Sequence, residues 1–211
     1  MDRPHLTNYD ACCLEVLAAE AAEVLAAGEL VIFPTDTVYG LAARADREHP
    51  VAHIFSAKRR PHDRPLPLLL PSADALADVA REVLPAAHAL AEAFWPGPLT
   101  LVLQRSDHVP SWITAGADTV AVRVPDHPLA RLILRMAPFL VAVTSANLSD
   151  EPTPSTAAEC AASLAEQPAL VIEAGELPGT ASTVVEVTSA GARVLRPGPV
   201  TQDQIDEVLR R

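Results

Sequence analysis

Short apolar runs along the chain alternate with longer segments whose apolar positions recur at helical spacing. The runs have the length of strands, whereas the longer segments carry the polar starts and the glycine or proline ends that are typical of helices. Strands are predicted at residues 30–33, 99–103, 119–124, 140–144, 169–172, 182–187 and 193–195. Helices are predicted at residues 11–27, from Pro50 onward, at 73–80, 86–95, 129–136 and 156–164, and after Thr201.

Particular residues set several of these helix boundaries. Asp10 is a candidate cap for the first helix, and Gly28 is expected to end it. A threonine followed three residues later by glutamate or glutamine forms a capping box, and this pattern occurs at Thr156 and again at Thr201.

The apolar run at residues 66–70 contains Pro67, which lacks the N–H that a central strand uses, so we expect an edge strand there. Strands and helices otherwise interleave, and several strands are short enough for hairpins. This arrangement predicts a twisted α/β sheet, mixed or mostly antiparallel, with flanking helices. A length of 211 residues suits a single domain over residues 1–211, and a hydrophobic content of 49% suffices for its core.

Composition narrows the class of protein. The formal net charge of −11 argues against broad, charge-driven binding of nucleic acid. The three cysteines have no metal-ligand spacing, and the odd count suits thiols in a reducing compartment. No signal peptide is visible, and glutamates interrupt the best candidate for a membrane span, so we expect a soluble cytoplasmic protein. His49 and His53 lie one helical turn apart but have no third ligand nearby, and we interpret them as a solvent-facing pair rather than a metal site.

A short basic loop contrasts with this acidic background. It spans residues 58–64 and holds four of the sixteen basic residues, Lys58, Arg59, Arg60 and Arg64. The nearby prolines stiffen its backbone, and lysine and arginine on a stiff loop suit phosphate groups. The alternative interpretation is an ordinary solvated loop.

Polar residues gather where predicted strands begin or end. Thr37 follows the strand at 30–33, Ser145 and Asn147 follow the strand at 140–144, and Thr119 begins another. Such positions commonly carry ligands in α/β sheets, although small polar residues also suit ordinary turns.

Two further cations, Arg123 and Arg196, lie in or beside apolar strands. A cation in that setting needs a partner, which is either a ligand or an acid of the chain. The segment 150–155 is expected to form a mobile loop, because it is acidic and proline-rich and has no apolar anchor.

The candidate site offers hydroxyls, an amide and cations. The sequence shows no Ser-His-Asp or Cys-His arrangement, no Walker-type glycine loop and no dinucleotide-binding fingerprint. These side chains suit a reaction that needs positioning and charge stabilisation, and phosphoryl and nucleotidyl transfer are of that kind.

Several of these segments together resemble the YrdC (TsaC) family of threonylcarbamoyl-AMP synthases. The matching blocks occur in the family's order, and they are PTDTVYGL at 34–41, KRRP at 58–61, WPGPLT at 95–100, TVAVRVP at 119–125, SAN at 145–147, STVV at 182–185 and LRPG at 195–198. The resemblance implies a twisted α/β sheet around a concave site. It also implies a nucleotidyltransferase that makes threonylcarbamoyl-AMP and pyrophosphate from L-threonine, bicarbonate and ATP, with Mg²⁺ accompanying the ATP. Partner proteins would then transfer the threonylcarbamoyl group to tRNA, with which this chain would have at most a weak contact.

The resemblance also implies residue roles. Lys58 and Arg60 would be the catalytic residues. Threonine would be held by Thr37, Arg123, Ser145 and Ser182. ATP would be held by Lys58, Arg60, Arg64, Thr119, Asn147, Ser155 and Arg196. No protein-bound metal is implied.

Four positions depart from the family's usual pattern. Arg59 stands where a small residue is common, Leu69 where many members have histidine, Asp150 where glycine is frequent, and Asp36 where glutamate is commoner. Two rival functions remain at this point. One is a related domain that makes carbamoyl-adenylate from carbamoyl phosphate, and the other is an RNA-binding module without enzymatic activity.

Overall fold

The structure is a computed structural model that describes residues 5–9 and 13–210. Its helical segments are α1 (Leu14–Ala27), α2 (Glu48–Lys58), the 3-10 turn η2 (Ala73–Ala75), α3 (Leu76–Val79), α4 (Pro85–Phe94), α5 (Pro128–Met136), α6 (Ala157–Ser163) and α7 (Gln202–Leu209). Its strands are β1 (His5–Asn8), β2 (Val31–Phe33), β3 (Gly40–Arg44), β4 (Leu68–Leu69), β5 (Leu99–Gln104), β6 (Thr119–Arg123), β7 (Val141–Ser145), β8 (Leu170–Glu173), β9 (Thr183–Thr188) and β10 (Gly191–Arg196).

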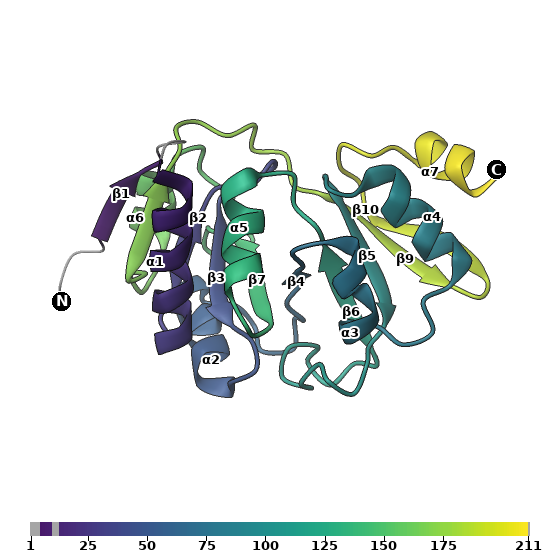
Figure 1. Cartoon of the computed structure of the whole chain (residues 1–211), viewed down its shortest axis with the longest axis horizontal. Coiled ribbons are helices and arrows are strands. Elements are labelled where there is room, and N and C mark those ends of the chain that lie inside the picture. Colours follow the sequence, from purple (N-terminus) through teal and green to yellow (C-terminus); the bar gives the residue numbers. More distant parts are fainter. Residues whose placement is uncertain (1–4, 10–12, 211) are drawn as a thin grey trace.

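The strands of the described residues form one ten-stranded sheet in the order β1-β8-β2-β3-β7-β4-β6-β5-β9-β10. Parallel and antiparallel pairs both occur: β2 pairs with β8 in parallel and with β3 antiparallel. The predicted fold class, a mixed α/β sheet with flanking helices, is therefore confirmed. Figure 1 shows the sheet running across the molecule, with the N-terminal elements at one end and β9, β10 and α7 at the other.

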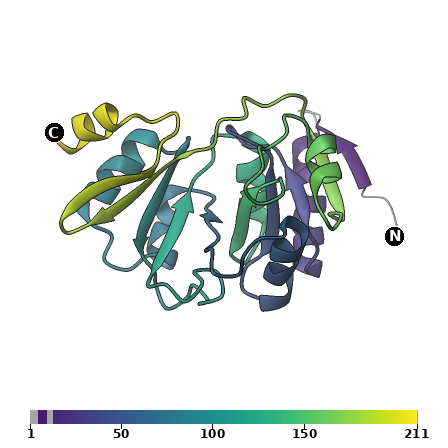
Figure 2. The same ribbon diagram turned by 180° about the vertical axis from the view of Figure 1, so that it is seen from behind.

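The alternation of side chains along the strands explains how both faces of the N-terminal half of the sheet are covered. Val31 and Phe33 of β2 pack in one apolar cluster with α1 and α5, whereas Ile32 packs in the other with α2 and α6. Figure 1 shows α1 and α5 side by side over one face, and Figure 2, from behind, shows α2 and α6 on the other.

The residues that start and end helices act largely as predicted. Gly28 ends α1 with a left-handed φ of 93°. Thr201 makes both halves of a capping box with Gln204, and the Thr156 hydroxyl accepts from the Glu159 amide at 3.3 Å. The predicted cap Asp10 lies outside the described residues.

The prediction of an edge strand at residues 66–70 is wrong. The strand is only Leu68–Leu69, and it lies inside the sheet between β7 and β6. Pro67 is tolerated because it precedes the strand and contributes only its carbonyl, which accepts from the Val143 amide at 3.0 Å. A two-residue strand thus joins the two halves of the sheet.

Sequence patterns did not predict β1 or β3. In β3, Gly40 is required by close packing, because a Cβ there would lie 2.6 Å from the Val143 Cγ1 atom of β7. The polar stretch after β2 connects it to β3, which is an antiparallel neighbour of both β2 and β7.

Candidate active site

A cavity of about 300 Å³ lies where the short strand β4 joins the two halves of the sheet. Its lining comes from β4, β5, β6, β7, β9 and β10, from the β2–β3 connection, and from the basic loop. Of the predicted site residues, six line this cavity: Thr37, Arg60, Arg123, Ser145, Ser182 and Arg196. The chain therefore brings together residues that are up to 159 positions apart in sequence, from Thr37 to Arg196.

Arg123, at the end of β6, is the most enclosed of the cations that line the cavity, with 6% of its surface exposed. Its Nε donates to the Gly97 carbonyl and one terminal nitrogen donates to the Thr37 hydroxyl, both at 2.9 Å, while the other terminal nitrogen pairs with the Asp36 carboxylate. A guanidinium has five N–H groups, so one N–H on each terminal nitrogen is left for a ligand. The sequence predicted that Arg123 pairs either with an acid of the chain or with a ligand. In the structure it pairs with the acid Asp36, and two of its N–H groups are left for a ligand.

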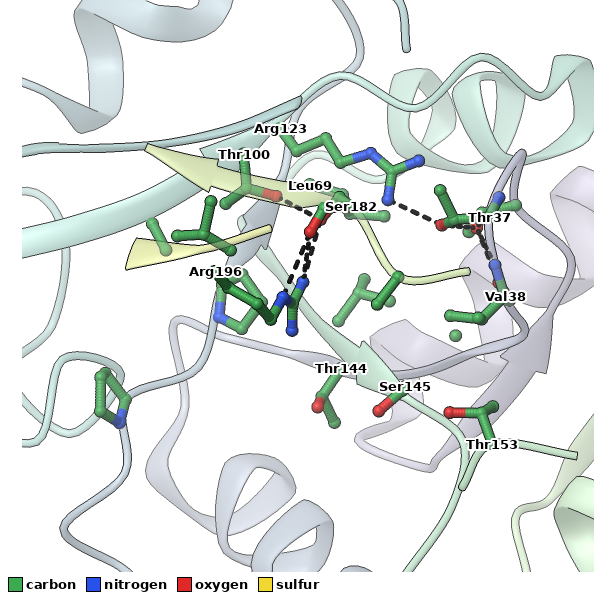
Figure 3. A pocket seen from close by; sticks show the side chains of 18 of the residues that line it. Thr37, Val38, Leu69, Thr100, Arg123, Thr144, Ser145, Thr153, Ser182 and Arg196 are labelled. Carbon is green, nitrogen blue, oxygen red and sulfur yellow. Dashed lines mark hydrogen bonds between the residues drawn. The ribbon is translucent and has the colours of Figure 1, made fainter. Parts of the chain in front are cut away.

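A second set of contacts joins β5, β9 and β10. The Ser182 hydroxyl lies 2.8 Å from the Thr100 hydroxyl, and Arg196 donates to the Ser182 carbonyl from Nε at 3.2 Å and from Nη2 at 2.9 Å (Figure 3). The register of β10 against β9 shifts between Val194 and Arg196, which redirects the arginine at the end of the strand.

Gly198 lets the chain after β10 return close to β9. A Cβ at this position would lie 2.4 Å from the Thr183 amide nitrogen, so only glycine fits. The LRPG block thus has a physical explanation, since its arginine reaches Ser182 and its glycine permits that approach.

The basic loop contributes Arg60 to the cavity. Its Nε donates to the Arg64 carbonyl at 3.4 Å and its Nη2 to the Pro65 carbonyl at 2.9 Å, so the loop's own backbone orients the guanidinium. Arg64 itself is exposed and pairs with Asp150 at 2.7 Å. Arg59 lies between Lys58 and Arg60 with a left-handed φ of 49°, a conformation that glycine, which has no Cβ, adopts at less cost.

Lys58 and Asn147 do not line the cavity, although both were expected to contact ATP. Both are buried, and the Lys58 ammonium donates to the carbonyls of Ser145 and Asn147 and to the Asn147 side chain.

Three more predicted residues are not part of the lining: Arg64, Thr119 and Ser155. Thr119 begins β6, two residues from Ala121 and four from Arg123, and so shares their face of the strand. The Ser155 carbonyl accepts from the Leu177 amide at 3.0 Å, which ties the loop after β7 to the segment before β9.

Other lining residues were not among the predicted site residues, notably Thr35, Thr100, Thr144 and Thr153. Thr35 accepts from the Thr37 amide and lies 3.0 Å from the Thr37 hydroxyl, so it supports that residue. Strand alternation could have identified Thr100, because Leu99 and Leu101 are fully buried on the opposite face of β5. Leu69, the departure at the histidine position, also lines the cavity.

Burial makes positive charge costly both at the cavity and at Lys58, which is buried outside its lining. Burial, followed by the neighbouring charge of Arg60, lowers the pKa of Lys58 to about 8. Burial also lowers the pKa of Arg123, against the opposing effect of Asp36, and burial followed by Arg64 lowers that of Arg60. Of these three groups, Arg60 and Arg123 line the cavity, and an anion beside them would favour their charged forms, so the cavity is suited to a negatively charged ligand.

Within the described residues, no group of three or more His, Cys, Asp or Glu could hold a metal ion. The rings of His49 and His53 are in contact at a tilt of 59°, with centroids 4.4 Å apart. None of the helices in the described part of the chain is long and apolar enough to span a membrane.

The fold and the site together define a class: a twisted mixed sheet with an anion-suited cavity built from its strand ends. Residues 23–198 match the family model Sua5/YciO/YrdC, described as telomere recombination, and the chain belongs to this family.

Two curated relatives carry the name threonylcarbamoyl-AMP synthase. The protein from Pyrococcus abyssi is 43% identical over 190 residues, which cover 90% of this chain and 56% of that protein. The protein from Bacillus subtilis is 40% identical over 193 residues, again 90% of this chain and 56% of that protein. This chain thus spans little more than half the length of these two relatives.

A solved structure of P. abyssi Sua5 complexed with L-threonine superposes with a TM-score of 0.91 at 39% identity. The match covers 99% of this chain and 61% of that one, so the sheet described above is shared throughout.

Proposed function

We propose that the protein is an L-threonylcarbamoyl-AMP synthase, which forms threonylcarbamoyl-AMP and pyrophosphate from L-threonine, bicarbonate and ATP. One observation carries the proposal: Arg123, which has N–H groups left for a ligand, lines the same cavity as Arg60 and Arg196. The names of the relatives, and the L-threonine bound to P. abyssi Sua5, support it.

Arg123 and Thr37 are proposed to bind threonine. The two remaining N–H groups of Arg123 match the two oxygens of a carboxylate, and the pairing with Asp36 keeps the guanidinium in place before the ligand arrives. The hydroxyls of Ser145 and Ser182 complete the proposed threonine site.

Arg60 and Arg196 are proposed to face the phosphates of ATP, with Arg64, Thr119 and Ser155 at the margin. In the proposed reaction the threonine nitrogen attacks the carbon of bicarbonate, and water leaves to give a carbamate. A carbamate oxygen then attacks the α-phosphorus, the bond from this phosphorus to the bridging oxygen breaks, and pyrophosphate leaves. Arginine donors that stabilise the charge on the phosphate oxygens are the contribution this chain can make, since no protein nucleophile is needed.

Mg²⁺ is proposed to accompany ATP. This ion is usually held by substrate phosphates and one or two carboxylates, and it would offset phosphate charge in the cavity. Among the described residues no acid lines the cavity, and Asp36, the neighbour of Thr37 in the chain, is engaged by Arg123, so the chain's own donors suit the phosphates more than the ion. We further propose that the product is passed to proteins that modify tRNA.

Product analysis tests the function directly. The protein is mixed with ATP, Mg²⁺, bicarbonate and L-threonine, and threonylcarbamoyl-AMP and pyrophosphate are measured by mass spectrometry and a coupled assay. We expect both products in equal amounts, none without threonine, and strong inhibition by EDTA. Pyrophosphate release with carbamoyl phosphate in place of threonine and bicarbonate would instead support carbamoyl-adenylate formation. Salt-sensitive RNA binding without ATP consumption would support a binding module.

A further inference from the structure

Lys58 uses all of its hydrogen-bond donors within the chain. Lys58 is the last residue of α2, and 1% of its surface is exposed. It donates to the Ser145 carbonyl, to the Asn147 carbonyl at 2.6 Å and to the Asn147 Oδ1 atom at 3.3 Å. An ammonium has three N–H groups, so these contacts leave none for a phosphate.

Asn147 is saturated in the same way. Its Nδ2 atom donates to the Leu148 carbonyl at 2.7 Å and to the Glu151 carbonyl at 2.6 Å, while its Oδ1 atom accepts from Lys58 and from the Thr153 hydroxyl. Both amide hydrogens are therefore used, and the contact with Lys58 fixes which way the amide faces. The backbone adds another link, because the Ser149 amide donates to the Lys58 carbonyl at 2.9 Å.

We infer that Lys58 and Asn147 are positioning residues that hold the segment 145–153 against α2, and that neither donates a hydrogen bond to ATP. The inference rests on the proposed function for its catalytic consequence, but its structural part does not. Two residues of the held segment, Ser145 and Thr153, line the cavity, so the pair acts on the site through them. Figure 3 shows both hydroxyls on the side of the cavity opposite Arg123 and Ser182. A displacement of about 1 Å at such a wall can cost about a hundredfold in rate.

Amide hydrogen exchange without any ligand tests the positioning role, because a residue that only bound phosphate would leave the free protein unchanged. In Asn147→Ala, exchange of residues 148–153 is expected to be at least about tenfold faster than in the wild type, with β5, which pairs with β6 and β9, unchanged as the internal reference. Lys58→Met is expected to do the same. Should that variant fail to fold because three carbonyl-type acceptors lose their donor, Asn147→Ala alone decides the matter. The matched control is Arg60→Met, which lies on the same loop and should leave this segment as it is. Unchanged exchange of residues 148–153 in Asn147→Ala would overturn the inference.

The second measurement is the salt dependence of ATP binding, made without threonine and bicarbonate so that no turnover occurs. Arg60→Met is expected to flatten this dependence, because one ion contact with the phosphates is lost. Lys58→Met and Asn147→Ala are expected to keep the wild-type dependence while kcat falls about tenfold to a hundredfold. A dependence that flattens in Lys58→Met as much as in Arg60→Met would show that Lys58 contacts phosphate and would refute the inference. A wild-type protein that binds ATP but yields no threonylcarbamoyl-AMP would instead refute the proposed function, and the exchange and salt comparisons would still stand.

Discussion

We call the lining around Arg123 the fixed end of the cavity and the lining around Arg60 the loop end, and the two are built in different ways. At one end, Arg123 extends from a strand, is buried, and is fixed by Gly97, Thr37 and Asp36. At the other end, Arg60 lies on a loop, is half-buried, and is oriented by carbonyls of that same loop. The first end is held by the sheet and the second by local backbone.

The difference suggests what each end is suited to bind. A guanidinium fixed on a strand before the ligand arrives suits a small rigid group such as an amino-acid carboxylate, for which geometry matters most. Cations on a loop can adjust to a flexible chain of phosphates whose charge moves during the reaction. The predictions below test whether the first end discriminates by shape and the second by charge.

The largest expected effect is at the fixed end, in the choice of amino acid. Valine has a methyl where threonine has its hydroxyl, so it would leave buried polar groups at the site unpaired. A site built to bind a hydroxyl rejects such an analogue by about 10⁴-fold, whereas serine, which lacks one methyl, should lose only about 1–3 kcal/mol. Pyrophosphate release with each amino acid at equal, subsaturating concentration measures the order.

Ser145 is the candidate hydrogen-bond partner of the threonine side-chain hydroxyl. Thr37 and Ser182 already have side-chain partners, in Arg123 and Thr100, while within the described residues no bond is recorded for the Ser145 hydroxyl. Ser145→Ala should therefore narrow the gap between threonine and valine. A wild-type protein that accepts valine as readily as serine would refute the idea of a hydroxyl-reading site, even if adenylation itself occurred.

The next effect is at the loop end. Arg60→Ala removes a charge-stabilising donor and should cost about 3 kcal/mol of transition-state stabilisation, a hundredfold or more in rate. The free energy of unfolding should fall by no more than about 1 kcal/mol, because within the described part of the chain the Arg60 side chain bonds to two carbonyls of its own loop. Single-turnover kinetics and urea unfolding measure the two quantities.

Arg59→Gly is the matched control for Arg60→Ala. Arg59 is exposed, does not line the cavity and has a left-handed φ, so glycine should keep the rate and should not lower stability. Full turnover by Arg60→Ala would remove the distinction between the two ends of the cavity.

The fixed end was also easier to predict from the sequence. A charged residue inside an apolar strand needs a partner, so Arg123 could be predicted as a site residue from its strand alone. Thr37 could be predicted because it follows a buried strand. Strand alternation, turn chemistry and capping boxes are local rules, and they predicted most of the helices and strands.

The arrangement at the loop end depends on contacts that no local rule contains. Lys58 and Arg60 occupy the same short motif, yet one is enclosed by the carbonyls that follow β7 and the other faces the cavity. Which of them is enclosed depends on where residues 145–147 fold back, nearly ninety positions later. The interior position of β4 has the same cause, since strand order is set by long-range pairing that Pro67 alone could not reveal.

The third prediction concerns the loop at residues 150–155, which we expect to close over ATP. Its ends are held through the Asn147 side chain and the Ser155 carbonyl, while Asp150 between them is exposed. Hydrogen exchange of this segment should slow several-fold when ATP and threonine are both present. Equal exchange with and without ligands would contradict closure, and α1, none of whose residues lines the cavity, provides the reference segment.

The smallest expected effect is that of the ion pair between Arg64 and Asp150. Both side chains are exposed, and Asp150 holds the pKa of Arg64 up, while Arg64 lowers that of Asp150. The acid lies where it can compete with a phosphate for Arg64, and its negative charge also acts on Arg60. Asp150→Asn should therefore lower the KM for ATP, by no more than about fivefold because exposed pairs are weak.

The matched control is Asp63→Asn, which removes a nearby negative charge from the same basic loop. The charge of Asp63 also acts on Arg60 and Arg64, but within the described residues Asp63 forms no ion pair with either of them. The difference between the two variants should vanish near 1 M salt, where charges are screened over about 3 Å. An equal KM for Asp150→Asn and the wild type at low salt would show that this acid does not compete with ATP, and the loop end would then be open to phosphate without any internal rival.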